Sequence, residues 1–161
     1  MKINRILRNS NPFLVVIMLF LFYQLLFFLI RGLEYCLNIQ DIVFSDTPIE
    51  SIEDYSLIKT ILAVIIIAPI LETVIVQKFG YFLLNKIRIF RKNKCLIVIA
   101  GAIIFALFHN FSVMYLINMS LLGFILMYAY VIKRYKGGFW ITASIHIINN
   151  VLSIFISTSF T

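Results

Sequence analysis

The chain has 161 residues, of which 62% are hydrophobic and only 13% charged, and its mean hydropathy is +1.01. One soluble core of this size cannot hide so much apolar surface, which excludes a water-soluble globular domain. The net charge of +7 comes from cations that flank apolar runs, so we expect membrane lipid and no nucleic acid as a partner. The composition predicts an all-α, polytopic integral membrane helix bundle.

Five apolar runs are long enough to cross a bilayer, which takes about 20 residues per helix. In chain order, we expect transmembrane helices at residues 12–31, 57–84, 95–113, 114–133 and 138–158. The third and fourth runs follow each other directly, and only the polar residues Asn110, Ser112 and Asn118 mark a division between them. Two longer, tilted helices are therefore an alternative for this part of the chain.

The basic residues predict the orientation of these helices. Twelve of the 14 Lys and Arg residues form three clusters, at 2–8, 78–94 and 133–136. Positive charges next to transmembrane helices favour the cytoplasmic side. Five crossings place all three clusters on one face, which predicts a multi-pass plasma-membrane protein with a cytoplasmic N-terminus. Cys36 and Cys95 then lie on opposite faces, so no disulfide is expected between them.

The acidic residues divide the chain into two parts. Residues 1–56 are interpreted as an N-terminal anchor helix followed by an acidic external loop, with a short surface helix at 49–55. Residues 57–161 form the predicted core, and they contain one acidic residue, Glu72, inside the second helix. The other six acids all lie in the predicted loop: Glu34, Asp41, Asp46, Glu50, Glu53 and Asp54.

Glu72 is the first sign of a functional site. A carboxylate within a transmembrane helix costs about 3 kcal/mol even on lenient insertion scales, so the folded protein must offset that cost. Pro69, three residues earlier, removes one backbone hydrogen bond and leaves the Ile65 carbonyl without its usual donor. A kink at this depth is tolerated where it lines a polar cavity, so both residues indicate the same place.

Three pairs of residues, each with at least one polar member, have a spacing of four. This spacing puts the two members of each pair on one helix face. These pairs are Thr73 with Gln77, Phe105 with His109, and His146 with Asn150. His109 and His146 are the only histidines in the chain. Each alone is as compatible with helix packing as with catalysis.

Depth in the membrane supports a common site for these polar residues. Counting from the basic clusters, Glu72 is 14 residues from Lys86, His109 is 15 from Lys94, and Asn150 is 14 from Lys136. At about 1.5 Å of rise per residue, these distances predict one common level, with His146 one turn further in.

Three motifs follow in order along the last two thirds of the chain. They are Pro69-Ile-Leu-Glu72-Thr73-Val-Ile-Val-Gln77, Phe105-Ala-Leu-Phe-His109 and His146-Ile-Ile-Asn-Asn150, the last preceded by Gly138-Phe-Trp140. In these motifs the chain resembles the CPBP (CAAX protease and bacteriocin-processing, or Abi) family of intramembrane metalloproteases, which includes the type II CAAX prenyl endopeptidases. The family has a second glutamate at the position of Thr73 and an arginine at that of Gln77. We interpret this as a paired replacement that can form a hydrogen bond, which is gentler than the loss of one charge of a buried pair.

The resemblance implies an intramembrane endopeptidase that cleaves a membrane-associated or lipidated peptide or protein. It implies four catalytic residues, Glu72, His109, His146 and Asn150. It also implies three substrate-positioning residues, Thr73, Gln77 and Phe105. A divalent metal such as Zn²⁺ would be held by Glu72, His109 and His146. Since no second carboxylate would then remain as the base, a metal-free mechanism with glutamate-activated water is an equal alternative.

Two further classes of function stay open. A non-enzymatic membrane protein, acting in bacteriocin self-immunity or in partner binding, could keep the same polar residues for helix packing. A transporter is less well supported, because five helices show no evident inverted repeat. So small a domain is also a candidate homo-oligomer.

Overall fold

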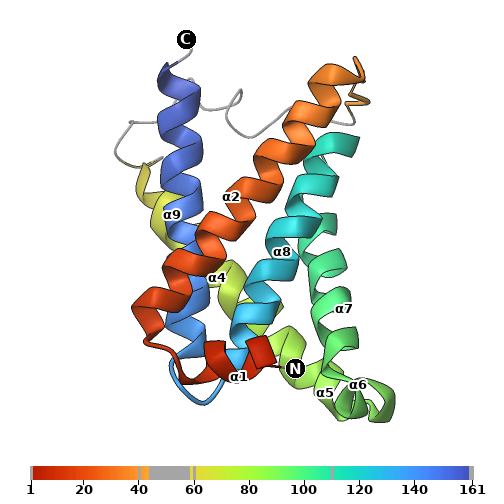
Figure 1. Ribbon diagram of the computed structural model, residues 1–161, viewed down its shortest axis with the longest axis vertical. Helices are drawn as coiled ribbons and strands as arrows, with labels where there is room; N and C mark the ends of the chain where they lie inside the picture. The colour runs from red at the N-terminus through yellow and green to blue at the C-terminus, as the bar shows by residue number, and fades with distance from the viewer. Residues whose placement is uncertain (1, 40, 44–58, 60, 110, 160–161) are drawn as a thin grey trace.

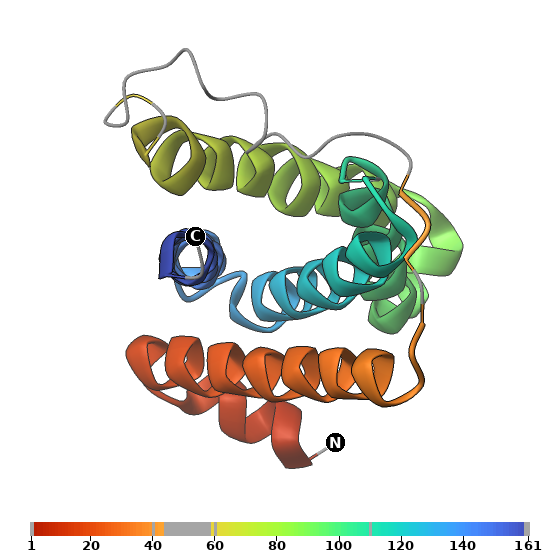
Figure 2. The same cartoon turned by 90° about the horizontal axis from the view of Figure 1, so that it is seen from above.

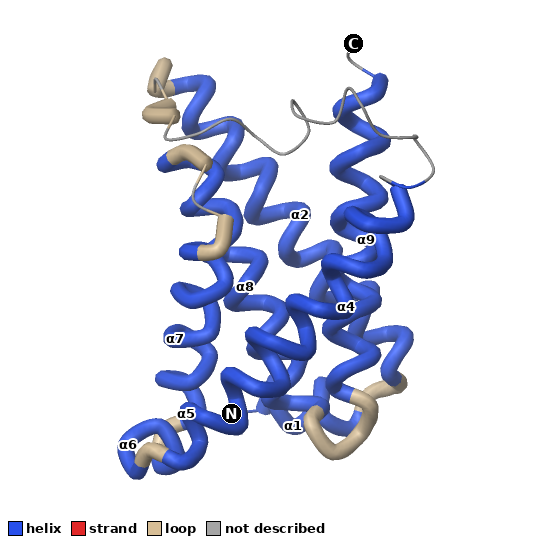
Figure 3. The backbone as a smooth tube through the Cα atoms, turned by 180° about the vertical axis from the view of Figure 1, so that it is seen from behind, coloured by secondary structure: helices blue, strands red, loops and turns tan. Residues whose placement is uncertain are grey.

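A computed structural model describes residues 2–39, 41–43, 59, 61–109 and 111–159. In this part of the chain all regular secondary structure is helical and no strand is present (Figure 3), as the all-α prediction requires. Several sequence-based expectations lie outside the described residues: those for the loop acids Asp46, Glu50, Glu53 and Asp54, the surface helix at 49–55, and Asn110.

Short turns connect most of the helices (Figure 1), except that 25 residues separate α2 from the composite helix. They are α1 (Lys2–Asn9), α2 (Pro12–Cys36), α6 (Arg88–Lys92), α7 (Lys94–Leu107), α8 (Val113–Lys133) and α9 (Gly138–Ser159), together with one composite helix. The composite helix runs without a break over Leu62–Lys86, through η1 (Leu62–Ile67), α4 (Ala68–Glu72), η2 (Thr73–Phe79) and α5 (Gly80–Lys86).

Four helices of the described part are long and apolar enough to cross a membrane, namely α2, the composite helix, α8 and the Gly138–Ile156 part of α9. The shorter α7 is apolar as well. The chain is therefore a multi-pass membrane protein with a helical bundle fold.

The helices form three layers. Seen from above, α8 and α9 lie between α2 on one side and the composite helix on the other (Figure 2), and α7 packs beside α8. The N-terminal helix α1, the short α6 and the turn between α8 and α9 all lie at one end of the bundle (Figure 1). This brings the three basic clusters to one end, which we call the basic end. Its assignment to the cytoplasm stays a prediction.

Most predicted helix boundaries are close to the observed ones, but the third helix is shorter than the predicted 95–113. It ends at Leu107, and the His109 amide then donates to the Ala106 carbonyl at 2.8 Å in a tight turn. Ser112 starts the next helix, because its hydroxyl oxygen accepts a hydrogen bond from the Tyr115 amide at 3.1 Å. The placement of His109 inside a helix is thus wrong: it lies in the turn after α7.

The predicted anchor helix, α2, shares the core of the bundle. Val15, Leu19 and Tyr23 of α2 are buried in one cluster with side chains of α8 and α9. Gln24 of α2 also donates to the side-chain oxygen of Asn149 in α9 at 3.2 Å. The anchor helix therefore packs directly beside the helix that carries His146 and Asn150.

Gly123 allows α7 and α8 to approach closely. A Cβ atom at Gly123 would lie 2.8 Å from the Phe105 Cβ and 3.1 Å from the Ala102 backbone, so one helix would have to shift. We expect Gly123→Ala to destabilise the protein by about 2 kcal/mol through overpacking, and to lower its unfolding temperature in detergent. The matched control is Gly32→Ala in α2, where nothing lies within 4 Å. Equal unfolding temperatures for the two variants would contradict this account.

The start of the acidic loop is tied to the N-terminus of α8. Asp41 accepts hydrogen bonds from the Ser112 hydroxyl at 2.5 Å and from the Met114 amide at 3.0 Å. The Val113 amide donates to the Ile42 carbonyl at 3.1 Å. These contacts satisfy amides that a helix N-terminus leaves free, and the carboxylate suits the positive end of the helix dipole.

The tether at Asp41 predicts a dependence on pH. Partial desolvation acts to raise the pKa of Asp41, but the hydrogen bonds from Ser112, Met114 and Ile42 and the charge of Arg31 lower it below its usual range. The Asp41 carboxylate therefore contributes fully to stability above its ordinary pKa of about 3.9. This contribution is lost as the pH falls through the lower pKa that Asp41 has in the folded protein. We expect Asp41→Ala to cost about 1 kcal/mol, as for a lost helix cap, and to speed hydrogen exchange at Met114 about fivefold. Unchanged exchange at Met114 would contradict the tether.

Candidate active site

Glu72 lies in the composite helix, between two turns of wide, π-helical backbone. In the first of these, η1, hydrogen bonds run from an amide to the carbonyl five residues before it, as in the bond from Ala68 to Ala63. The donor for the Val64 carbonyl in this pattern would be residue 69, which is a proline without an N–H. The sequence-based expectation named the Ile65 carbonyl instead, because it assumed a regular α-helix. Short π-helical segments occur frequently at functional sites.

Asn150 occupies the position that the proline leaves open. Its side-chain amide donates to the Val64 carbonyl at 2.9 Å, which links α9 to the composite helix two turns before Glu72. A buried carbonyl without a donor is costly, so this bond stabilises the irregular backbone. In this structure Asn150 therefore contacts the helix that carries the carboxylate, while its catalytic role stays a prediction.

Three predicted residues from three parts of the chain meet at one oxygen atom. The Nε2 atoms of His109 and His146 each lie 3.6 Å from Glu72 Oε2. This distance suits an ion pair and is too long for a hydrogen bond. The Glu72 side chain is 28% exposed and that of His146 only 3%, so the carboxylate lies at the edge of the bundle and the second imidazole lies inside it. The three side chains thus converge, although the sequence placed His146 one turn further in than Glu72 and His109.

Phe105 holds both imidazole rings in place. It is fully buried, stacks on the ring of His109 at a centroid distance of 4.6 Å, and meets the ring of His146 edge to face at 5.4 Å. Its carbonyl oxygen lies 2.9 Å from His109 Nδ1. Phe105 thus contacts the two histidines, whereas its predicted contact with a substrate stays a prediction.

The hydrogen bond to Phe105 determines the tautomer of His109. A carbonyl oxygen only accepts, so Nδ1 must carry the proton, and Nε2 faces Glu72. Two lone pairs would face each other if both groups were unprotonated at these atoms. A proton on either atom removes that repulsion, so the two groups have the chemistry of an acid–base pair, although at 3.6 Å they form no direct hydrogen bond.

Thr73 and Gln77 lie in the core of the bundle. Both side chains are completely buried, and their polar atoms have no hydrogen-bond partner among the described residues. The hydrogen bond expected between them is therefore not formed here. Their burial separates them from the exposed side of Glu72, so their substrate-positioning role stays a prediction.

The predicted metal ligands have suitable chemistry, but their arrangement does not establish a metal site. A carboxylate and two imidazoles are common zinc ligands. Within the described part of the chain, no group of three or more His, Cys, Asp or Glu side chains is arranged to hold a metal ion. Ligand histidines almost always donate from their second nitrogen, as His109 does to the Phe105 carbonyl, whereas the Nδ1 atom of buried His146 has no hydrogen-bond partner among the described residues. Metal binding at these side chains stays a prediction.

Sequence reasoning missed two contributors to the site. Tyr115 of α8 lies close enough to Glu72 for the two side chains to interact electrostatically. Val64 contributes its carbonyl to the bond with Asn150. Tyr115 belongs to none of the three motifs, so no sequence pattern indicated it, and a backbone acceptor has no signature in the residue type at all.

The fold and the site together define a class: a polytopic membrane protein with a Glu–His–His constellation inside a helical bundle. The family model of the type II CAAX prenyl endopeptidase Rce1-like proteins matches residues 54–152, more than half of the chain. The chain belongs to this family, as the resemblance of its motifs predicts. No curated protein and no solved structure matches the chain significantly.

Proposed function

We propose that the protein is an intramembrane endopeptidase that cleaves a membrane-associated or lipidated peptide or protein with water activated by Glu72 and His109. Membership of the Rce1-like family supports a CAAX-type membrane protease. The observation that carries the mechanism is the meeting of both histidines at one carboxylate oxygen. Glu72 Oε2 is buried and has no hydrogen-bond partner among the described residues, so its lone pairs are free to accept a proton.

In the proposed reaction, the water oxygen attacks the carbonyl carbon of the peptide bond while its proton passes to the Glu72–His109 pair. The developing negative charge on the carbonyl oxygen is stabilised by a hydrogen bond from His146. The C–N bond then breaks, and the pair returns the proton to the leaving amine. The products are a carboxylic acid and an amine, and Glu72 and His109 regain their starting protonation.

The experiment that tests this proposal is peptide-terminus profiling of host membranes that contain the wild type or Glu72→Gln at matched levels. Glutamine keeps the size of the side chain but cannot accept the proton, so we expect the new termini to appear with the wild type only. The matched control is Glu34→Gln, which removes a carboxylate that pairs with Arg31 outside the site, and which should leave the termini unchanged.

The opposite result would support a different class of function. If wild type and Glu72→Gln give the same termini while Glu72→Gln keeps the wild-type phenotype, the peptidase proposal is wrong. A non-enzymatic role in bacteriocin self-immunity or partner binding would then take its place. Metal analysis of the purified protein tests the zinc alternative separately.

A further inference from the structure

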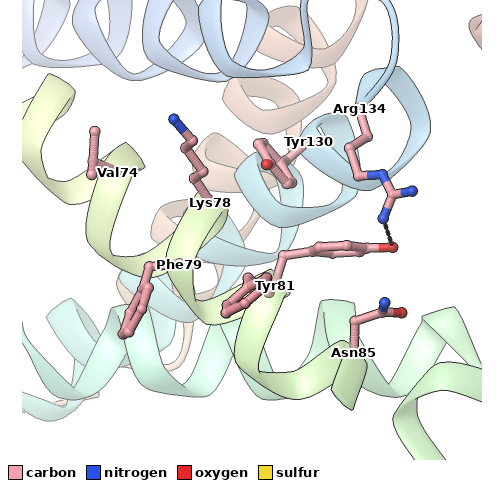
Figure 4. A pocket seen from close by; sticks show the side chains of 8 residues that line it. Val74, Lys78, Phe79, Tyr81, Asn85, Tyr130 and Arg134 are labelled. Atoms are coloured by element: carbon pink, nitrogen blue, oxygen red, sulfur yellow. Dashed lines mark hydrogen bonds between the residues drawn. The ribbon is translucent and has the colours of Figure 1, made fainter. Parts of the chain in front are cut away.

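A cavity lies toward the basic end, between the composite helix and α8 (Figure 4). Its volume is about 430 Å³. Cationic, aromatic and aliphatic side chains line it, chiefly Lys78, Tyr81, Phe82, Tyr130 and Arg134. Glu72 is not among the lining residues, and Lys78 lies six residues beyond it, about 9 Å along a regular helix. The cavity is therefore distinct from the candidate active site.

The cations of this cavity have no acidic partner in the described part of the chain. The ion pairs found there join Arg31 to Glu34 and the two histidines to Glu72. After residue 54, Glu72 is the only acidic residue in the sequence. The cavity thus carries positive charge that the described residues do not neutralise, which favours an anionic ligand.

Arg134 is held in position by aromatic rings. Its guanidinium donates a hydrogen bond to the Tyr81 hydroxyl at 2.5 Å and lies 4.8 Å from the centre of the Tyr81 ring and 4.1 Å from that of Tyr135. The Lys94 ammonium lies 5.5 Å from the centre of the same Tyr81 ring. A guanidinium fixed in this way keeps further N–H donors in a planar fork, the geometry that matches a phosphate group.

The remaining walls of the cavity suit a hydrocarbon chain. Val74, Phe79 and Phe82 line it, and all three side chains are exposed on the outside of the bundle. That surface faces lipid in a membrane-spanning helix. Tyrosines beside cations are typical of the level of the lipid headgroups. A soluble anion would use the cations alone, whereas an anionic lipid would use both the cations and the apolar wall.

We propose that this cavity binds an anionic phospholipid, with its phosphate at Arg134, Lys78 on another wall of the cavity, and an acyl chain along Phe79 and Phe82. Basic pockets between transmembrane helices bind anionic headgroups in this manner. The proposal does not depend on the proposed peptidase activity, since it uses none of the residues placed in the reaction.

The test is native mass spectrometry of the full-length protein in detergent, titrated with phosphatidylglycerol or with phosphatidylcholine of the same acyl chains. We expect the wild type to bind phosphatidylglycerol more tightly. The double variant Lys78→Gln/Arg134→Gln should weaken that binding about 25-fold, or about fivefold for each cation removed. The matched control is Arg91→Gln/Lys92→Gln, which removes the same charge from α6 at the same end but outside the cavity, and which should change binding less than about threefold.

Several results would overturn the proposal. Equal losses in the two double variants would overturn it, because they would show only diffuse attraction to the basic end. Equal binding of the two lipids would also overturn it, because the cavity would then not select an anionic headgroup. Displacement of phosphatidylglycerol by millimolar inorganic phosphate would overturn the lipid assignment and identify a soluble phosphate as the ligand. Arg134→Lys keeps the charge but loses the planar fork, so it should weaken binding less than Arg134→Gln does, with its unfolding temperature as the control for folding. A folded Arg134→Lys protein that binds no better than Arg134→Gln would contradict the role of charge.

Discussion

His109→Gln is expected to lower the kcat for peptide hydrolysis by about 10²- to 10⁴-fold, the usual contribution of an acid–base group. Glutamine can still donate a hydrogen bond to the Phe105 carbonyl, but it cannot act with Glu72 as an acid–base pair. The rate is measured with purified protein on the peptide that terminus profiling identifies. KM should change little, because His109 faces Glu72 and holds the reacting proton.

Chemical rescue separates catalysis from packing at this position. In His109→Ala, added imidazole should recover part of the lost kcat, because the side chain it replaces is partly exposed, at 17%. The unfolding temperature of each variant serves as the control for folding. A His109→Gln protein with the wild-type kcat would contradict the proposed mechanism.

Asn150→Leu is expected to reduce activity through the backbone of the composite helix. Leucine has a similar size but cannot donate to the Val64 carbonyl, which is partly buried, so the cost should fall near the lower end of the about 1–3 kcal/mol for an unsatisfied buried carbonyl. Adding Pro69→Ala to the same chain restores a backbone N–H at residue 69, which in the π-helical pattern would donate to the Val64 carbonyl. We therefore expect the double variant to recover stability and activity relative to Asn150→Leu.

The same pair of variants distinguishes the two roles of Asn150. If its amide acts on the oxyanion of the reaction, Pro69→Ala cannot replace it, and kcat stays low although the unfolding temperature recovers. If its amide acts through Val64, kcat and the unfolding temperature recover together. Loss of activity without any change in stability, and without rescue, would contradict the positioning role.

Local residues at the helix ends explain why some boundaries were predictable and others were not. Polar or basic residues bound the C-terminal end of α8 and both ends of α9, so these ends were visible in the sequence. The end of α7 was not, because Phe108 and His109 continue the pattern of a helix. A local turn and the cap at Ser112 ended it instead.

By itself, the sequence determined the class of the protein and the members of its candidate site. Apolar length requires membrane-spanning helices, and a carboxylate and two histidines within about one turn of the same depth predict a meeting point. Only the tertiary structure decided which atoms meet. The π-helical backbone made Val64 the free carbonyl, Asn150 reached it from another helix, and Phe105 oriented both imidazoles. Apart from the local contact of Phe105 with His109, these contacts join residues far apart in the chain, and helix packing sets their distances.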